Sequence, residues 1–126
     1  MTDIFIKSFN RPFYLDRCLT SVYRCVLGNF RVKILDDGTP EKYLKKIKEK
    51  FPEAEIITSR NYSIKIAAIE ENLKSGREIN GFEIPTDLWI DAAKNGSEYF
   101  IMTEDDVWFT KEINIDELVS DMKKLE

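Results

Sequence analysis

The sequence of 126 residues contains no histidine, and this absence excludes several classes of site. Zinc sites built on imidazole, Ser-His-Asp triads and histidine phosphorelay all need that side chain. Any metal ion would therefore be held by carboxylates. Cysteine is scarce, with Cys18 and Cys25 seven positions apart in a helical pattern, which is too far for a disulfide within one straight helix. We expect two buried thiols in a reducing compartment.

Long apolar runs are also absent. No stretch approaches the roughly 20 apolar residues of a membrane span, and the first residues lack the layout of a secretory signal. These features predict a cytoplasmic protein or the cytoplasmic part of a larger one. The net charge of −4 disfavours nucleic acid as a partner. The length, with 43% hydrophobic and 33% charged residues, predicts one folded domain over residues 1–126.

Short apolar runs alternate with segments of helical periodicity along the chain. Continuous apolar runs predict buried strands at residues 4–6, 32–35, 56–57 and 99–102. Apolar residues at three-to-four spacing predict helices between 12 and 28, 40 and 51, 62 and 76, 86 and 96, and from about 116. This alternation predicts an α/β domain with a mainly parallel sheet flanked by helices.

Polar residues follow three of the predicted strands, at the edge where ligands bind in open α/β sheets. They are Ser8 and Asn10 after the first strand, Asp36 and Asp37 after the second, and Glu104, Asp105 and Asp106 after the fourth. Three consecutive acids are weak evidence in a chain with 23 of them. Their place directly after a buried strand is stronger evidence, because crowded carboxylates there need a compensating cation, such as Mg²⁺ or Mn²⁺.

Each of these residues also has an ordinary structural interpretation. The acidic triplet fits a solvated turn, and Asp37 fits a carboxylate that caps the following helix. Ser8 and Asn10 are common in turns and helix caps.

Four stretches, taken together, resemble a known family. Phe9-Asn10-Arg11-Pro12 is similar to a Tyr-Asn-Arg-Pro turn, residues 33–39 are similar to a Val-Asp-Asp-Gly-Ser signature, and residues 97–106 are similar to a strand that runs into an Asp-x-Asp motif. The leucines and the serine of residues 15–22 fit the helix between the first two motifs. This order resembles the nucleotide-sugar glycosyltransferases of the GT-A fold, chiefly the large inverting family that begins with a Rossmann-like half.

The resemblance implies a role for each residue at this edge. Asp37 would bind the base of a uridine- or guanosine-type nucleotide with support from Asp36, and Asp105 would approach the ribose. Asp106, assisted by Glu104, would bind the Mn²⁺ or Mg²⁺ ion that bridges the donor phosphates. Ser8 and Asn10 would line the nucleotide pocket. The partners implied are a nucleoside-diphosphate sugar and a carbohydrate or lipid-linked acceptor.

The sequence departs from the family in two places. Residues 60–82 contain no clear copy of the family's Gly-rich, Ala-Arg-Asn helix, although Arg60, Lys65 and Arg77 are cations that could meet the diphosphate, and Arg77 is preferred. The ordinary interpretation of Arg77 is a solvated arginine on the surface. Only 20 residues follow Asp106, where family members place the acceptor site and the catalytic carboxylate. We therefore expect either a metal-dependent, inverting glycosyltransferase or a nucleotide-sugar-binding module without independent transferase activity.

Two other classes fit poorly. A receiver-type phosphotransfer domain needs acids after its first strand, where this chain has Ser8 to Arg11. A sugar nucleotidyltransferase needs a glycine-rich loop there, and residues 7–12 contain no glycine.

Overall fold

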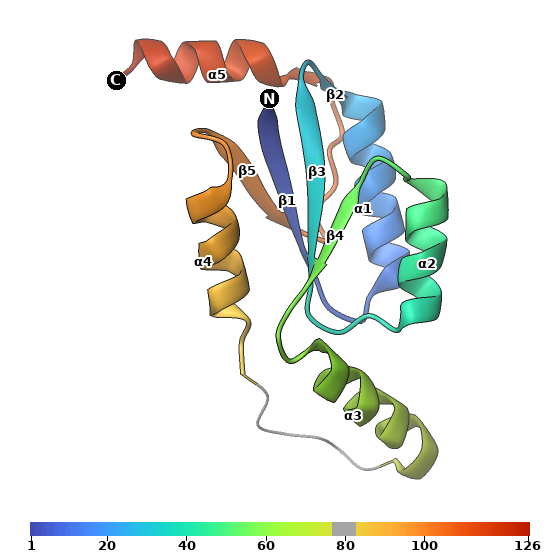
Figure 1. Ribbon diagram of the computed structural model, residues 1–126. Coiled ribbons are helices and arrows are strands. Elements are labelled where there is room, and N and C mark those ends of the chain that lie inside the picture. Colours follow the sequence, from blue (N-terminus) through green and yellow to red (C-terminus); the bar gives the residue numbers. More distant parts are fainter. Residues whose placement is uncertain (77–82) are drawn as a thin grey trace.

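The computed structural model describes residues 1–76 and 83–126, and its centre is a four-stranded parallel sheet in the order β4-β3-β1-β5 (Figure 1). A separate pair of short strands, β2 and β6, lies beside it. The elements in chain order are β1 (Thr2–Ser8), α1 (Pro12–Cys25), β2 (Val26–Leu27), β3 (Phe30–Asp36), α2 (Glu41–Lys50), β4 (Glu55–Thr58), α3 (Tyr62–Ser75), α4 (Thr86–Asn95), β5 (Phe100–Glu104), β6 (Ile113–Asn114) and α5 (Ile115–Lys124).

The α/β fold with a parallel sheet confirms the class predicted from the sequence. The four apolar runs form β1, β3, β4 and β5, and each predicted helix is present in the described residues. β2 and β6 were not predicted, because two residues are too few to show a periodic pattern.

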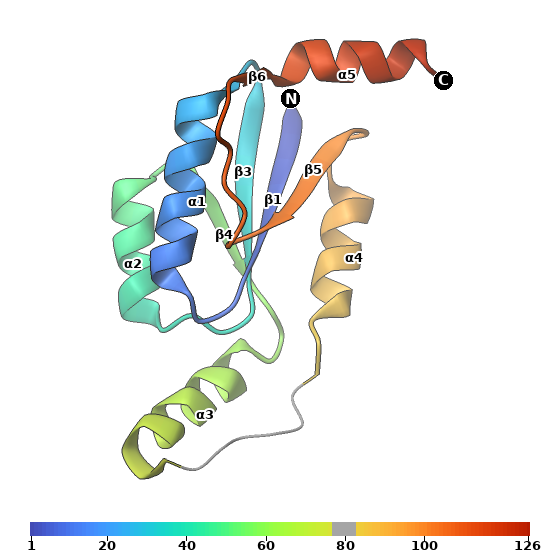
Figure 2. The same cartoon turned by 180° about the vertical axis from the view of Figure 1, so that it is seen from behind.

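The main core lies between the sheet and the helices α1 and α2, which cover the same face (Figures 1 and 2). Alternate residues of a strand point to opposite faces. Ile4 and Ile6 of β1 and Ile34 of β3 therefore meet Leu15 and Leu19 of α1, and all five side chains have no exposed surface. Cys18 and Cys25 are buried free thiols in the same helix, as expected.

The opposite face of the sheet carries α4 (Figure 1). Phe5 of β1 is buried there and packs edge-on against Phe100 of β5, with ring centroids 5.5 Å apart. Gly96, which ends α4, approaches Phe5 so closely that a Cβ atom at this position would lie 2.8 Å from the ring. The missing side chain of Gly96 therefore lets this end of α4 pack against the sheet.

The segment after β5 returns along α1 from the carboxyl ends of the strands to their amino ends (Figure 2). The Phe109 amide donates a hydrogen bond of 3.0 Å to Ser21 Oγ, and the Cys25 thiol lies 3.6 Å from the Phe109 carbonyl oxygen. β6 then pairs with β2, and α5 begins with its amides capped by Asn114. None of the described helices combines the length and the apolar composition needed to cross a bilayer.

The strand register aligns the polar residues predicted for the site. Ser8 at the end of β1 is paired with Asp36 at the end of β3, and Lys7 is paired with Glu104 at the end of β5. The chain moves from β1 to β3 and β4 on one side, and then crosses to β5 on the other side of β1. The carboxyl ends of β1 and β5 thus flank the topological switch point, where ligands bind in this class of sheet.

Candidate functional site

Asp36 is buried and forms hydrogen bonds with the turn that follows β3. Its Oδ1 accepts hydrogen bonds from the amides of Gly38 and Thr39, at 3.0 and 2.7 Å. Its Oδ2 accepts from the hydroxyls of Ser8 at 2.5 Å and Thr39 at 2.6 Å. Both oxygens are therefore used by the chain itself, and Asp36 ties the ends of β1 and β3 together.

Asp37 lies beside Asp36 but has a different environment. Its amide donates to the Ser8 carbonyl at 2.9 Å, and its side chain does not cap the following helix, where Asp36 binds the turn amides instead. Asp37 is 7% exposed. Its Oδ2 forms an ion pair with Lys65, whereas its Oδ1 is buried without a hydrogen-bond partner among residues 1–76 and 83–126. The interpretation of Asp37 as a cap is thus wrong.

Lys65 of α3 is one of the three cations considered from the sequence, of which Arg77 was preferred. Its side chain is almost completely buried, and its ammonium group contacts the Asp37 carboxylate and donates a 2.7 Å hydrogen bond to the Glu83 carbonyl. The nitrogen also lies 5.9 Å from the centroid of the Phe9 ring. A signal existed in the sequence, because Lys65 falls within the apolar stripe formed by Tyr62, Ile66, Ile69 and Leu73.

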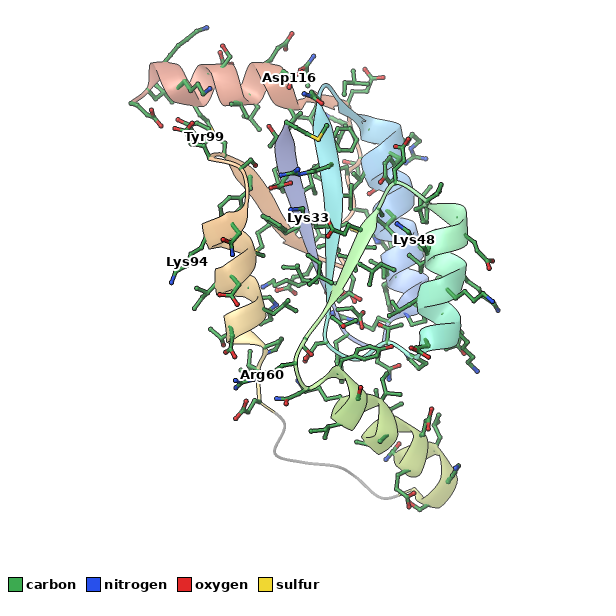
Figure 3. All side chains as sticks on the ribbon, in the orientation of Figure 1. Lys33, Lys48, Arg60, Lys94, Tyr99 and Asp116 are labelled. Carbon is green, nitrogen blue, oxygen red and sulfur yellow. The ribbon has the colours of Figure 1, made fainter. Side chains whose placement is uncertain are left out.

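The other two cations considered for this site have different positions. Arg60 is exposed and pairs with Glu83 at 3.1 Å and with Asp87 of α4 at 3.3 Å, so it lies on the outside between α3 and α4 (Figure 3). Arg77, the preferred cation, lies outside the described residues.

Asp105 is the buried member of the acidic turn after β5. Its carboxylate is held by Arg11, with contacts of 2.6 Å to the terminal nitrogen and 3.3 Å to Nε, and its amide donates to the Lys7 carbonyl. Burial raises the pKa of Asp105 above its usual value. Arg11 and the Phe9 amide act in the opposite direction, and the negative charge of Asp106 adds to the rise.

The other two acids of this turn remain accessible. Glu104 pairs with Lys7 at 3.2 Å, and its side chain is 53% exposed. Asp106 lies 3.7 Å from Arg11 and its side chain is 46% exposed. Asp105 and Glu104 therefore already have cationic partners within the chain, and Asp106 is the acid with the weakest pairing.

In the described part of the chain, no group of three or more acidic or thiol side chains is arranged to hold a metal ion. The residues therefore do not form a complete metal site of their own. Mg²⁺, however, is commonly held by one or two carboxylates together with substrate phosphates. Asp106 and Glu104 are the accessible carboxylates of this turn, and such a shared cation would contact them.

A pocket of about 460 Å³ lies next to these turns, at the carboxyl ends of β1 and β5. Its lining residues are Lys7, Ser8, Phe9, Arg11, Asp37, Lys65, Glu83, Ile84, Pro85, Trp89 and Glu104. The structure thus brings Ser8, Asp37 and Glu104 together, as the sequence analysis expected for residues of one site. Asp36 and Asp105 lie behind the lining, and Asp106 is linked to it through Arg11.

Phe9 separates this pocket from a second hollow between α2 and α3, which Asn10 also lines. The ring is 41% exposed and lies against Gly38, where an added Cβ atom would come within 2.6 Å of it. Asn10 adopts a left-handed backbone with φ of 46°, and it does not cap α1 with its side chain. The tight turn at Asn10 carries the chain from Phe9 into α1.

Comparison with known proteins identifies a similar fold. No protein-family model matches the chain, and no curated protein matches it. Among solved structures, the crystal structure of S. aureus TarS, a glycosyltransferase, superposes with a TM-score of 0.66 at 12% identity. The chain therefore shares its α/β fold with part of TarS.

The match covers 98% of this chain and 20% of that TarS chain. A crystal structure of TarS residues 1–349 matches with a TM-score of 0.60 and 15% identity, over 98% of this chain and 32% of that one. The chain thus spans a third or less of the TarS chains that it matches. The shared architecture includes the parallel sheet whose carboxyl edge carries the pocket.

Proposed function

We propose that the chain is a metal-dependent glycosyltransferase that transfers a sugar from a nucleoside-diphosphate sugar to an acceptor hydroxyl, with inversion at the anomeric carbon. The observation that carries this proposal is Asp37, which lines the pocket and has one carboxylate oxygen, Oδ1, buried without a donor in the described residues. Such an oxygen costs free energy until it accepts a hydrogen bond. The glycosyltransferase-like fold supports the choice of ligand.

The pocket suits a nucleobase. Uracil and guanine each carry a ring N–H next to a carbonyl group, and Asp37 Oδ1 would accept a hydrogen bond from that N–H. Phe9 offers a flat, partly exposed ring in the same wall, on which the base would stack. Stacking of a base on an aromatic side chain contributes about 1–3 kcal/mol and does not depend strongly on the base. Asp37 would therefore provide most of the selectivity.

The diphosphate would lie toward the switch point, where Lys7 and Arg11 line the pocket. Both side chains attract anions, and Arg11 also holds Asp105 and approaches Asp106. A divalent cation shared between Asp106 and the phosphates would offset the negative charge of the departing diphosphate. In the transfer, the acceptor oxygen bonds to the anomeric carbon while the carbon–oxygen bond to the diphosphate breaks. The nucleoside diphosphate leaves with the bonding electron pair, and the hydroxyl proton passes to solvent water.

One observation favours the second interpretation, a module that binds nucleotide-sugar without transferring it. Of the described residues, Asp37, Glu83 and Glu104 are the carboxylates that line the pocket. Each is paired with a cation, namely Lys65, Arg60 and Lys7 respectively. A general base for the acceptor hydroxyl needs an available oxygen near the anomeric carbon. The paired carboxylates are poorly prepared for that role.

A thermal-shift experiment tests nucleotide binding. Uridine, guanosine, cytidine and adenosine diphosphates are added to the wild type and to Asp37→Asn, each with and without Mn²⁺. We expect uridine or guanosine diphosphate to raise the melting temperature of the wild type. In Asp37→Asn, an amide N–H₂ competes for the position of the free oxygen, so the shift should be largely lost. The control is Asp121→Asn, because Asp121 is an exposed carboxylate on α5.

An equal shift for all four diphosphates, or an unchanged shift in Asp37→Asn, would contradict the proposed base recognition. Release of nucleoside diphosphate from a nucleotide-sugar in the presence of acceptor separates the two interpretations. Binding with turnover supports a transferase, and binding without turnover supports the module.

A further inference from the structure

Three exposed aromatic side chains form a continuous surface beside the acidic turn. Phe13 and Tyr14 belong to the first turn of α1, and Trp108 follows the acidic triplet; they are 64%, 44% and 47% exposed. The Tyr14 and Trp108 rings are stacked, with centroids 6.5 Å apart and planes at 21°, and Phe13 meets Tyr14 edge-on at 6.5 Å. We call these three residues the aromatic surface.

Charged groups surround the aromatic surface. The Arg17 guanidinium lies 4.9 Å from the centroid of the Phe13 ring, and the Arg11 guanidinium lies 5.9 Å from that of Tyr14. Arg11 also holds Asp105 and approaches Asp106. Arg17 forms no salt bridge within the described ranges of the chain. The aromatic surface is therefore continuous with the acidic turn, and hydrogen-bonding groups lie along its margin.

Exposed apolar patches with a polar margin commonly mark binding sites. A sugar ring matches this surface chemically, because it has an apolar C–H face and a rim of hydroxyl groups. The face would pack on Trp108 and Tyr14, and the hydroxyls would meet Arg17 and Asp106. A hydrophobic protein segment fits less well, because it would bury the Arg17 charge, which has no salt bridge in the described residues, without providing a partner for it.

We propose that the aromatic surface binds the carbohydrate part of the acceptor. That the bound carbohydrate is an acceptor rests on the proposed function. That this surface binds carbohydrate does not. Of the three aromatic residues, none lines the nucleotide pocket, and Arg11 is the residue that connects the two regions. The nucleotide and the acceptor would thus bind on opposite sides of Arg11, with the acidic turn between them.

The test uses the complete chain on a broad glycan array, followed by calorimetric titration with the oligosaccharide that binds most strongly. The variants are Trp108→Ala, the conservative Trp108→Phe, and Leu73→Ala as a control. Leu73 is an apolar residue of α3 that is 80% exposed. Circular dichroism establishes that each variant is folded, which we expect because Trp108 is half exposed. Nucleotide binding is measured in parallel by thermal shift.

We expect Trp108→Ala to weaken glycan binding by about tenfold or more, since most of the apolar contact is lost. Trp108→Phe should retain most of the affinity, and Leu73→Ala should bind like the wild type. The nucleotide thermal shift should be unchanged in all three variants. If the nucleotide shift is absent while Trp108-dependent glycan binding is present, the proposed function fails and the glycan site stands.

Three results would overturn the inference. They are the absence of glycan binding by the wild type across the array, equal binding by Trp108→Ala, and a change from oligomer to monomer in Trp108→Ala. The last result, measured by sedimentation, would assign the aromatic surface to contacts between copies of this chain.

Discussion

Lys65 of α3 and Asp37 of the turn after β3 form a buried ion pair, 28 residues apart in the chain. In the fully described helix α3, Lys65 is the one residue that is buried. The same ammonium group binds the Glu83 carbonyl, which precedes α4. This ion pair therefore connects the candidate nucleotide site to the two helices on either side of it.

Removing Lys65 should destabilise the fold. Lys65→Met leaves the Asp37 carboxylate buried without its partner, and loss of one member of a buried pair commonly costs about 3–5 kcal/mol. Lys74→Met, at an exposed position of the same helix, should change the free energy of unfolding by about 0.5 kcal/mol or less. Urea unfolding measures both. The double variant Asp37→Asn with Lys65→Met should lose less free energy of unfolding than the two single variants lose in total. Strict additivity of the two losses would show that the residues are not coupled.

The buried carboxylate of Asp3 should make the free energy of unfolding depend on pH in the acidic range. Burial alone would raise the pKa of Asp3, but hydrogen bonds from Arg31 and the Ser97 amide, with the charge of Lys33, outweigh it and hold the pKa below the ordinary value of 3.8. A carboxyl group with a lowered pKa in the folded state stabilises the fold above the unfolded pKa. That stabilisation is lost as the pH falls through the folded pKa.

Asp3→Asn should therefore lower the free energy of unfolding at pH 7, and the difference from the wild type should shrink as the pH falls below about 3.8. Urea unfolding at a series of pH values measures this. Asp121→Asn, at an exposed position, is the control and should follow the wild type. A difference between Asp3→Asn and the wild type that is constant with pH would be inconsistent with the role given to Arg31 and Lys33.

Two exposed phenylalanines, four residues apart, should behave differently in nucleotide binding. Phe9→Ala removes the ring from the pocket wall and should weaken binding of uridine or guanosine diphosphate by about tenfold or more, from the loss of base stacking. Phe13→Ala removes a ring outside the pocket and should leave that binding unchanged. Isothermal titration calorimetry gives both affinities. Equal weakening by the two substitutions would place the base elsewhere.

Divalent cation and diphosphate should bind together. Because the described acids do not converge as a metal site, Mn²⁺ alone should shift the melting temperature little. The shift produced by Mn²⁺ together with a nucleoside diphosphate should exceed the sum of the two separate shifts. Asp106→Ala should abolish this synergy and leave the metal-free affinity for the diphosphate nearly unchanged. Glu112→Ala, after the turn, is the control. Strong binding of Mn²⁺ alone would indicate a metal site formed by the protein itself.

The fold could be predicted because its signals are local. Strands buried on both faces appear as short apolar runs, and helices that cover a sheet appear as apolar residues at three-to-four spacing. Ser8, Asp37 and Glu104 directly follow such runs or end them, so their position at one edge of the sheet followed from the parallel order alone. The pairing of β2 with β6 has no local signal, because it joins residues more than 80 positions apart.

The chain's own amino acids determined the helices and the four strands of the main sheet, that this sheet is parallel, and that carboxylates collect where its strands end. Only the tertiary structure decided what each carboxylate does. Asp36 and Asp37 are neighbours of the same residue type, yet Asp36 has both oxygens enclosed by hydrogen-bond donors, whereas Asp37 has one oxygen without a hydrogen-bond partner in the described residues. The physical reason is that secondary structure depends on neighbours in the chain, whereas the partners of a buried charge, such as Lys65 for Asp37 and Arg11 for Asp105, arrive from distant segments once the sheet has formed.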